Sequence, residues 1–146
     1  MKKIVFVLGL LAVMGVSNAY PSEKVSPKVL ASFKSEFSSA KNVEWETGNN
    51  YFRATFSLNE QRVFAYYSVE GELISVARYI STMQLPINLF SNLKNNYTKY
   101  WISDLFEVSN NDGLHYYVTL ETADTKLMMR SSNGGSWSTY SKNKKI

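Results

Sequence analysis

The hydrophobic pattern of the chain begins with a helical spacing. Leu30, Phe33 and Phe37 recur three and four positions apart, which is typical of one apolar face of a helix. Ser26 can cap the first turn, and Pro27 suits the first helical position because its missing amide would be unpaired there. The spacing therefore predicts an amphipathic helix that runs to about residue 39.

After this helix the apolar positions recur every second residue, which indicates strands with one buried face. One such set comprises Phe52, Ala54, Phe56 and Leu58, and the next comprises Val63, Ala65 and Tyr67. The turn at Asn59 and Glu60 separates the two sets, and a further turn at Gly71 precedes a strand from about residue 72 to 79. With a short first strand around Trp45, the segment reads as one helix followed by four strands.

The second half of the chain repeats this order. Pro86 precedes a second apolar stripe, formed by Leu89 or Phe90 with Leu93 and Tyr97. The alternating positions that follow are Tyr116, Val118, Leu120, Leu127 and Met129. A shift of 64 positions lays residues 52–76 on 116–140 without a gap, and residues 33–37 resemble 93–97. A period near 60 is closer to a duplicated half-domain than to a solenoid repeat.

The pattern predicts an α+β fold of two tandem half-domains, each with one helix packed on a four-stranded antiparallel sheet. We expect the repeats to span about 26–82 and 84–142, within one domain of residues 20–146. A chain of this length is the size of a single domain.

The amino terminus has the pattern of a secretory signal peptide over residues 1–19. Two lysines precede an apolar run from Ile4 to Val16, and Ser17 and Ala19 provide small residues before a cleavage point. The run is shorter than the roughly 20 residues of a membrane span. We therefore expect a periplasmic or secreted protein with no stable membrane anchor after cleavage.

The charge of the expected mature chain is modest. Residues 1–19 hold two lysines and no acidic residue, so their removal lowers the formal charge from +4 to +2. This balance does not favour nucleic-acid binding, which needs clustered basic residues. We interpret the basic tail, Lys142 to Lys145, as a solvated end.

The side chains of catalytic and metal sites are scarce. The chain has one histidine and no cysteine, so zinc binding is not expected. It has no recognisable nucleophile motif, and the turn at residues 110–113 lacks the acidic spacing of a calcium loop. We predict no cofactor, no metal and no enzymatic activity, although a carboxylate pair from distant segments would escape detection. His115 is expected to be half-exposed on a strand.

The opposite face of the predicted sheet carries the residues of greatest functional interest. Alternation places these side chains away from the helices: Tyr51, Arg53, Arg62, Phe64, Tyr66 and Ile74 in the first half, and His115, Tyr117, Lys126, Met128, Arg130 and Tyr140 in the second. Tyrosine, arginine, methionine and phenylalanine are enriched in protein interfaces. The candidate partner-binding residues are therefore Arg53, Arg62, Phe64, Tyr66, Tyr117, Met128 and Arg130. A homodimer interface and an ordinary solvated sheet are the alternatives.

Several short segments resemble the PepSY-like periplasmic proteins of Bacteroidetes. They are Phe37 followed by Asn42 to Trp45, the strand Tyr51 to Phe56, the segment Val63 to Tyr67 ending in Gly71, Leu85-Pro86, and Tyr97 with Tyr100 and Ile102. The resemblance implies a fold similar to that of the beta-lactamase-inhibitor proteins, and a binding or inhibitory role without catalytic residues. Ser68 stands where the family has an acidic residue, and Glu70-Gly71 stands where it has an Asp-Gly turn, so a metal or acidic-turn role does not carry over.

These observations predict an exported, non-enzymatic protein that binds, inhibits or regulates another exported protein, such as a hydrolase. The alternative is a carbohydrate-binding module that uses surface tyrosines and tryptophans as stacking platforms for sugar rings. A carrier of small molecules or lipids would need an enclosed apolar cavity between helix and sheet, which two compact halves are not expected to leave.

Overall fold

A computed structural model describes residues 24–146, so the expected signal peptide lies outside the described residues. The fold is α+β, with two helices and one antiparallel sheet of eight strands. The elements are α1 (Pro27–Glu36), β1 (Lys41–Thr47), β2 (Tyr51–Leu58), β3 (Gln61–Ser68), β4 (Leu73–Tyr79), the 3₁₀ turn η3 (Thr82–Gln84), α2 (Ile87–Asn96), β5 (Trp101–Asn110), β6 (Gly113–Glu121), β7 (Thr125–Ser132) and β8 (Ser138–Lys144). The predicted order of one helix followed by four strands is therefore present twice.

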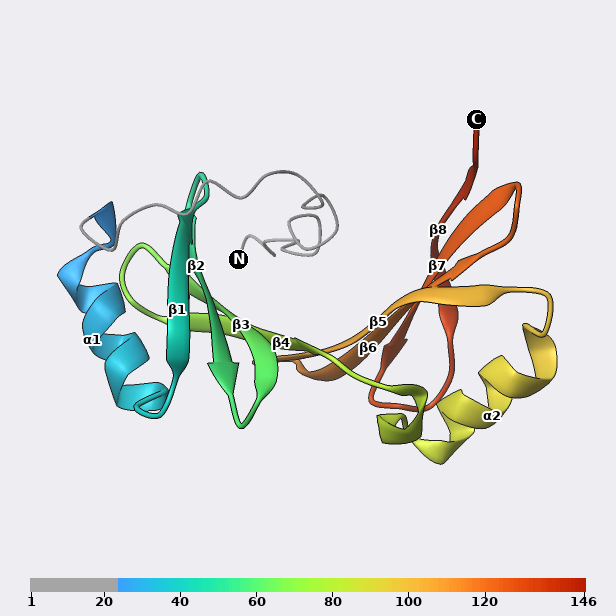
Figure 1. Ribbon diagram of the computed structural model, residues 1–146, viewed down its shortest axis with the longest axis horizontal. Helices are drawn as coiled ribbons and strands as arrows, with labels where there is room; N and C mark the ends of the chain where they lie inside the picture. The colour runs from blue at the N-terminus through green and yellow to red at the C-terminus, as the bar shows by residue number, and fades with distance from the viewer. Residues whose placement is uncertain (1–23) are drawn as a thin grey trace.

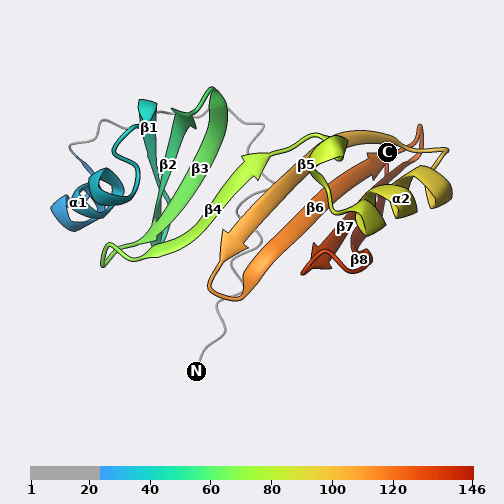
Figure 2. The ribbon, with the colours of Figure 1, turned by 90° about the horizontal axis from the view of Figure 1, so that it is seen from below.

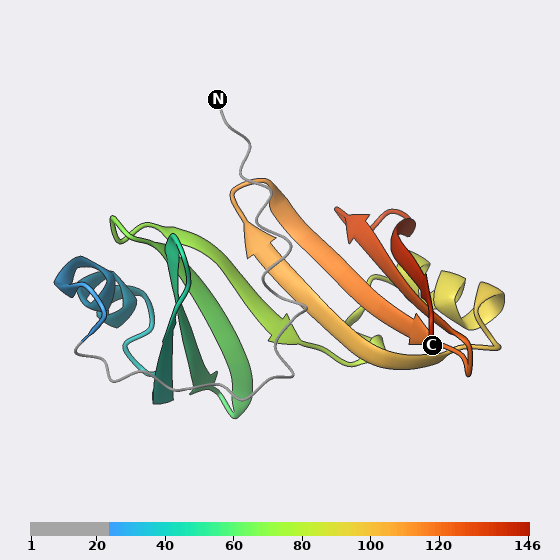
Figure 3. The ribbon, with the colours of Figure 1, turned by 90° about the horizontal axis from the view of Figure 1, so that it is seen from above.

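Each strand pairs with the next strand in the chain, so the sheet is a meander from β1 to β8 (Figure 3). The pairing continues through the middle, where Ser75 to Tyr79 of β4 pairs with Phe106 to Asn110 of β5. The prediction of two four-stranded sheets is not confirmed, because this pairing joins all the strands into one. The helices lie toward opposite ends of the long axis, with β4 and β5 between them (Figures 1 and 2).

The two helices end alike and begin differently. The Ser26 hydroxyl accepts a hydrogen bond from the Val29 amide at 3.3 Å, with Pro27 in the first turn, as expected. Pro86, however, occupies the N-cap of α2 and provides no side-chain cap. The amides of Phe37 and Tyr97 close the last turns on Phe33 and Leu93.

A turn glycine contacts the beginning of each helix. Gly71 has a φ of 92°, and a Cβ on it would lie 3.2 Å from the backbone of Lys28. Gly134 has a φ of 70°, and a Cβ there would lie 2.9 Å from the ring of Pro86. Positive φ and close packing both favour glycine at these positions. The structural counterpart of Gly71 is therefore Gly134 and not Gly135, which the ungapped repeat aligns with it.

The sheet and helices enclose two hydrophobic cores. The first contains Val25, Val29, Phe33, Trp45, Phe52, Ala54, Phe56, Val63, Ala65 and Tyr67. The second contains Ile80, Leu85, Leu89, Leu93, Leu105, Tyr116, Val118, Leu120, Leu127 and Met129. The strand register places both cores on the same face of the sheet. The periodic positions of both halves are confirmed as core residues, with Leu30, Phe37, Leu58, Phe90 and Tyr97 partly buried.

A polar contact lies between the cores. Arg78 of β4 and Glu107 of β5 are cross-strand neighbours, and Arg78 Nε donates to Glu107 Oε1 at 2.8 Å. Arg78 also donates to the side-chain oxygen of Gln61 at 3.0 Å. The register places Arg78 and Glu107 on the face that carries the two helices, so a polar cluster separates the two apolar cores within one sheet.

Irregular pairing in β4 changes the phase of its side chains. Tyr67 pairs with Leu73 but Tyr66 pairs with Ser75, so Ile74 is the extra residue of a β-bulge. Beyond the bulge, Val76 belongs to the first core. Ala77 and Tyr79 consequently lie on the opposite face, which simple alternation from Leu73 does not predict.

Candidate functional site

A row of aromatic rings crosses the face of the sheet opposite the helices, which we call the helix-free face. We define the aromatic row as Phe64 (β3), Tyr79 (β4), Phe106 (β5), Tyr117 (β6) and Tyr140 (β8). Successive ring centroids are 5.9, 6.4, 5.1 and 6.1 Å apart. These separations are in the range of favourable ring contacts. The row therefore joins strands of both halves into one surface.

Arginines lie over Phe64, the first ring of the row, and over Tyr117, the ring before the last. The guanidinium carbons of Arg53 and Arg62 are 5.8 and 5.5 Å from the centre of the Phe64 ring. That of Arg130 is 5.7 Å from the centre of the Tyr117 ring. Such cation–π contacts hold the arginine side chains along the sheet surface.

A cross-strand pair of arginine and tyrosine occurs in each half, with the two residues exchanged. Arg53 of β2 is opposite Tyr66 of β3, whereas Tyr117 of β6 is opposite Arg130 of β7. Burial raises the pKa of Tyr66 to about 12, although the Arg53 guanidinium favours the phenolate. Arg53 also forms an ion pair with Glu46. The same two residue types thus face each other at matching positions of the two halves, with their strands exchanged.

The structure places all seven candidate binding residues on the helix-free face, but it buries four of them. The exposed fractions are 2% for Tyr66, 4% for Tyr117, 6% for Met128 and 8% for Arg53. The sequence analysis predicted that side chains on this face are exposed, and this prediction is wrong for these four residues. Their neighbours contribute to the burial, since Phe106 stacks on Tyr117 with an interplanar angle of 10°.

The accessible part of the face is different from the predicted one. Arg62 is exposed, and Phe64 and Arg130 are partly exposed, as are Tyr51 and Tyr140. The largest addition is Tyr79, which is 50% exposed and is the second ring of the aromatic row, between Phe64 and Phe106. Sequence reasoning missed Tyr79 because the bulge at Ile74 reverses the alternation beyond it.

His115 is buried, with 4% of its surface exposed, so the expected half-exposed position is wrong. Its Nδ1 lies 3.1 Å from Ser132 Oγ and 3.1 Å from Arg130 Nη2. Because arginine only donates, Nδ1 is an acceptor and the imidazole is neutral, with its proton on Nε2. Burial and the neighbouring Arg130 both lower the pKa of His115. This environment favours a structural histidine.

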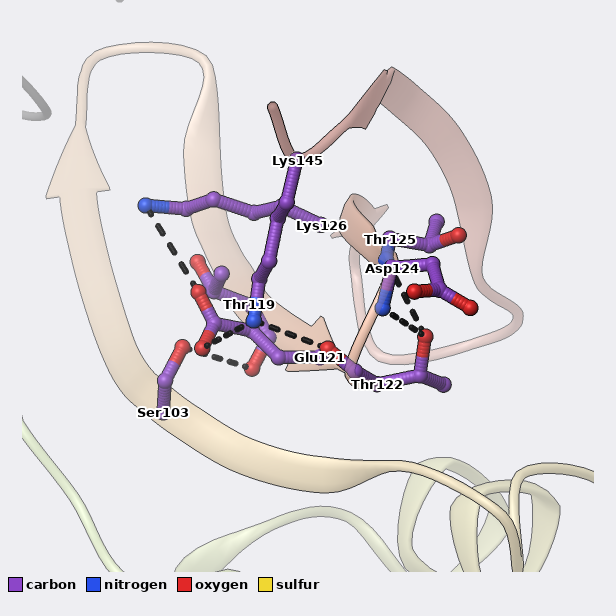
Figure 4. Close-up of polar contacts among 8 residues, drawn as sticks. All are labelled: Ser103, Thr119, Glu121, Thr122, Asp124, Thr125, Lys126 and Lys145. Carbon is purple, nitrogen blue, oxygen red and sulfur yellow. Dashed lines mark hydrogen bonds and ion pairs between the residues drawn. The ribbon is translucent and has the colours of Figure 1, made fainter.

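A polar cluster forms where β8 ends beside the turn between β6 and β7 (Figure 4). Glu121 lies between two lysines, with Lys145 Nζ at 3.3 Å and Lys126 Nζ at 3.9 Å. Lys145 Nζ also donates to the Thr122 carbonyl at 2.8 Å and lies 4.7 Å from the centre of the Trp101 ring. Residues 142–145 are exposed, as expected of a solvated end, although β8 pairs with β7 and Lys145 is held by these contacts.

A pocket lies between α2 and the sheet, on the face opposite the aromatic row. Its volume is about 260 Å³, and its lining residues are Thr82, Phe90, Leu93, Lys94, Tyr97, Thr98, Tyr100, Ile102 and Leu120. The pocket is partly open to solvent, so it is not the enclosed apolar cavity that a carrier would need.

Within residues 24–146, no group of three or more histidine, cysteine or acidic side chains is placed to hold a metal ion. Over the same residues, no helix has both the length and the apolar character of a membrane-spanning segment.

The fold is similar to that of solved Bacteroides proteins. A BLIP-like protein from Bacteroides fragilis matches with a TM-score of 0.71 and 15% identity, over 87% of this chain and 89% of that chain. A "putative periplasmic" protein from Bacteroides eggerthii matches with a TM-score of 0.72 and 11% identity, over 82% and 88%. A DUF2874 family protein from Bacteroides ovatus matches with a TM-score of 0.71 and 15% identity, over 81% and 86%.

At these identities the likeness shows the fold, and the resemblance to a BLIP-like fold in Bacteroidetes is confirmed. No protein-family model matches the sequence, and the search of curated proteins finds no match.

Proposed function

We propose that this chain is an exported, non-enzymatic protein that binds another exported protein through its helix-free face. The observation that carries the proposal is the aromatic row, which crosses strands of both halves on the face that neither helix covers. Aromatic side chains beside arginines supply large contact areas with polar groups at the edges, as in the central residues of many protein interfaces.

The exposed residues are the ones that would contact the partner. Tyr79 would be buried by the partner, because half of its surface is exposed and its ring lies between those of Phe64 and Phe106. Arg62 and Arg130 would make charge-assisted contacts at the rim. The buried residues Tyr66, Tyr117, Met128 and Arg53 would support the surface from below. This division replaces the sequence-based mechanism, in which Tyr66 and Tyr117 entered the partner.

Export and an inhibitory role belong to the same proposal. The Bacteroides eggerthii neighbour is described as a "putative periplasmic" protein and the Bacteroides fragilis neighbour as BLIP-like, which supports an exported binding protein. The amino-terminal pattern of residues 1–19 is consistent with export. Within this proposal the partner is an exported hydrolase that the chain inhibits or regulates. The two units of a helix and four strands are proposed to be duplicated half-domains, each contributing part of the surface.

The experiment uses the mature chain, residues 20–146, to capture partners from a periplasmic extract, followed by titration of the identified partner against variants. We expect Tyr79→Ala to weaken that complex by tenfold or more, with the thermal unfolding midpoint little changed, because the removed ring is half-exposed. Met83→Ala is the matched control, since Met83 is 83% exposed and belongs to η3, outside the aromatic row.

Two results would contradict the proposal. One is a captured partner whose affinity is insensitive to Tyr79→Ala and Phe64→Ala. The other is specific binding on a glycan array that Tyr79→Ala abolishes, which would support the carbohydrate-binding alternative instead.

A further inference from the structure

The pocket between α2 and the sheet exists because of a difference in side-chain size between the halves. With the helix offset of 60 positions and the strand offset of 64, Phe33 corresponds to Leu93 and Phe56 to Leu120. Phe33 and Phe56 are in contact in the first core, with ring centroids 5.1 Å apart. Leu93 and Leu120 instead line the pocket in the second half. Two phenylalanine rings therefore occupy in one half the space that is open in the other.

The third ring of the first-half cluster shows how closely that space is filled. Phe37 lies 5.5 Å from Phe33 and 4.8 Å from Phe56, measured between ring centroids. Its counterpart Tyr97 packs edge-on against Tyr100 at 5.9 Å, and both tyrosines line the pocket. The position of Tyr100 is held by Ala40 in the first half. In the second half, aromatic side chains therefore line the wall of a pocket, whereas in the first half they fill the interior of the core.

The lining indicates the chemistry of a ligand. Phe90, Tyr97 and Tyr100 present aromatic rings, while Leu93, Ile102 and Leu120 supply aliphatic surface. Lys94 is the charged residue among the described lining residues, and the hydroxyls of Thr82 and Thr98 are the other polar groups besides the tyrosines. An apolar cavity of about 150 Å³ holds one benzene ring. A volume of about 260 Å³ therefore accommodates a ligand of one or two rings.

We propose that this pocket binds a small aromatic carboxylate. The rings of the ligand would fill the space between α2 and β6 that Phe33 and Phe56 fill in the other half, and its carboxylate would pair with the Lys94 ammonium at the pocket mouth. The site lies on the helix-bearing face, so it is independent of the proposed binding of a protein by the helix-free face.

The test is a titration of the mature chain with 2-naphthoate, followed by isothermal calorimetry and by chemical-shift mapping. We expect a dissociation constant of about 1 mM or tighter, from the usual free energy per ligand atom. The shifts should centre on Leu93, Tyr97, Tyr100 and Leu120. Neutral 2-naphthamide, which has the same rings, should bind about threefold to tenfold more weakly, because it lacks the charge that Lys94 pairs with.

Two kinds of variant distinguish the contribution of the pocket volume to binding from that of the Lys94 charge. Leu93→Phe and Leu120→Phe each restore a ring that the first half has, and each should weaken 2-naphthoate binding at least tenfold by filling the pocket. Lys94→Met should remove the preference for naphthoate over naphthamide while leaving naphthamide binding unchanged. Lys34→Met is the matched control, because Lys34 is the counterpart of Lys94 on α1, and it should change neither affinity.

Three results would overturn the proposal. They are an absence of 2-naphthoate binding at millimolar concentration, shifts centred outside the pocket, and equal binding by the parent chain and a folded Leu120→Phe variant. Lys94→Met retains the cavity and removes only an exposed charge, so it gives a second answer if a phenylalanine variant fails to fold.

Discussion

Equivalent backbone positions in the two halves carry side chains of different chemistry. On the helix-free face, the neighbours Glu46 and Arg53 of β1 and β2 form an ion pair. The corresponding neighbours of β5 and β6 are Phe106 and Tyr117, which stack with their centroids 5.1 Å apart. An edge strand pair thus carries charge, whereas the equivalent pair in the sheet interior carries rings. Equivalent positions in the strand pairing therefore accommodate either an ion pair or two stacked rings.

On the helix-bearing face the difference is one of volume. The first core is largely aromatic, and Phe33 contacts Phe37, Trp45, Phe56 and Tyr67. The second core is largely aliphatic at the matching positions. The comparison teaches that a repeated backbone preserves the pattern of burial but not the completeness of packing. One half has a filled core, whereas the other has a pocket between its helix and the sheet.

The largest expected effect is the loss of the central ring of the first core. Phe33→Ala should lower the free energy of unfolding by about 3–5 kcal/mol, because it leaves an unfilled cavity among four aromatic neighbours. Leu93→Ala at the matching position should cost about 2–3 kcal/mol, since Leu93 already borders open space. Urea unfolding of the two variants measures the difference. Equal costs would show that the two cores are packed equally well.

A smaller effect distinguishes the halves at high pH. The Tyr67 hydroxyl donates to Glu36 Oε2 at 2.5 Å, and its counterpart under the 64-residue shift is Ser131, which has no titrating group in this range. Burial and then Glu36 raise the pKa of Tyr67 above its ordinary value of 10.0. The folded state therefore holds this proton more tightly than the unfolded state does. The contribution is fully present below about pH 10 and is lost as the pH rises through the folded pKa.

We expect the unfolding free energy to fall above pH 10, with Tyr67 contributing a slope of up to about 1.4 kcal/mol per pH unit. Tyr67→Phe should cost about 1 kcal/mol at neutral pH by removing the hydrogen bond, and it should make the slope shallower above pH 10. Denaturant unfolding between pH 8 and 11.5 checks both. An identical slope in the variant would contradict the assignment to Tyr67.

The smallest expected effect is at Ser131 itself. Its hydroxyl is buried without a hydrogen-bond partner among residues 24–146. Ser131→Ala should therefore leave stability unchanged or raise it by about 0.5 kcal/mol, because a desolvated hydroxyl is removed. A thermal melt measures the change. A loss above 1 kcal/mol would indicate that the hydroxyl has a partner, and Ser136→Ala, at an exposed position between β7 and β8, serves as the control.

Much of the fold follows from periodicity in the sequence. The spacing of two predicted both sets of core strand positions, and the spacing of three and four predicted both helices, because one buried face imposes those periods. The union of the strands into one sheet did not follow, since pairing of β4 with β5 depends on contacts between the halves. Tyr79 was missed because a bulge changes the phase without any glycine or proline at Ile74 to mark it.

The site was predicted less completely than the fold. Alternation assigns Tyr66 and Tyr117 to a face, but their burial depends on neighbours across several strands, such as Phe106 on Tyr117. The pocket had a visible signal, because the repeat aligns Phe33 with Leu93 and Phe56 with Leu120. When the side-chain volumes of these pairs are compared, the smaller leucines predict an unfilled space in the second half.

The strand order has a consequence for how the chain folds. Every strand pairs with its immediate successor, so each of the seven pairings from β1–β2 to β7–β8 closes only a short loop or a single helical connection. Loop-closure entropy is therefore small at each step, and folding rates rise as contacts become more local in sequence. The sheet can grow outward from any hairpin, one strand at a time, without waiting for the two ends of the chain to meet.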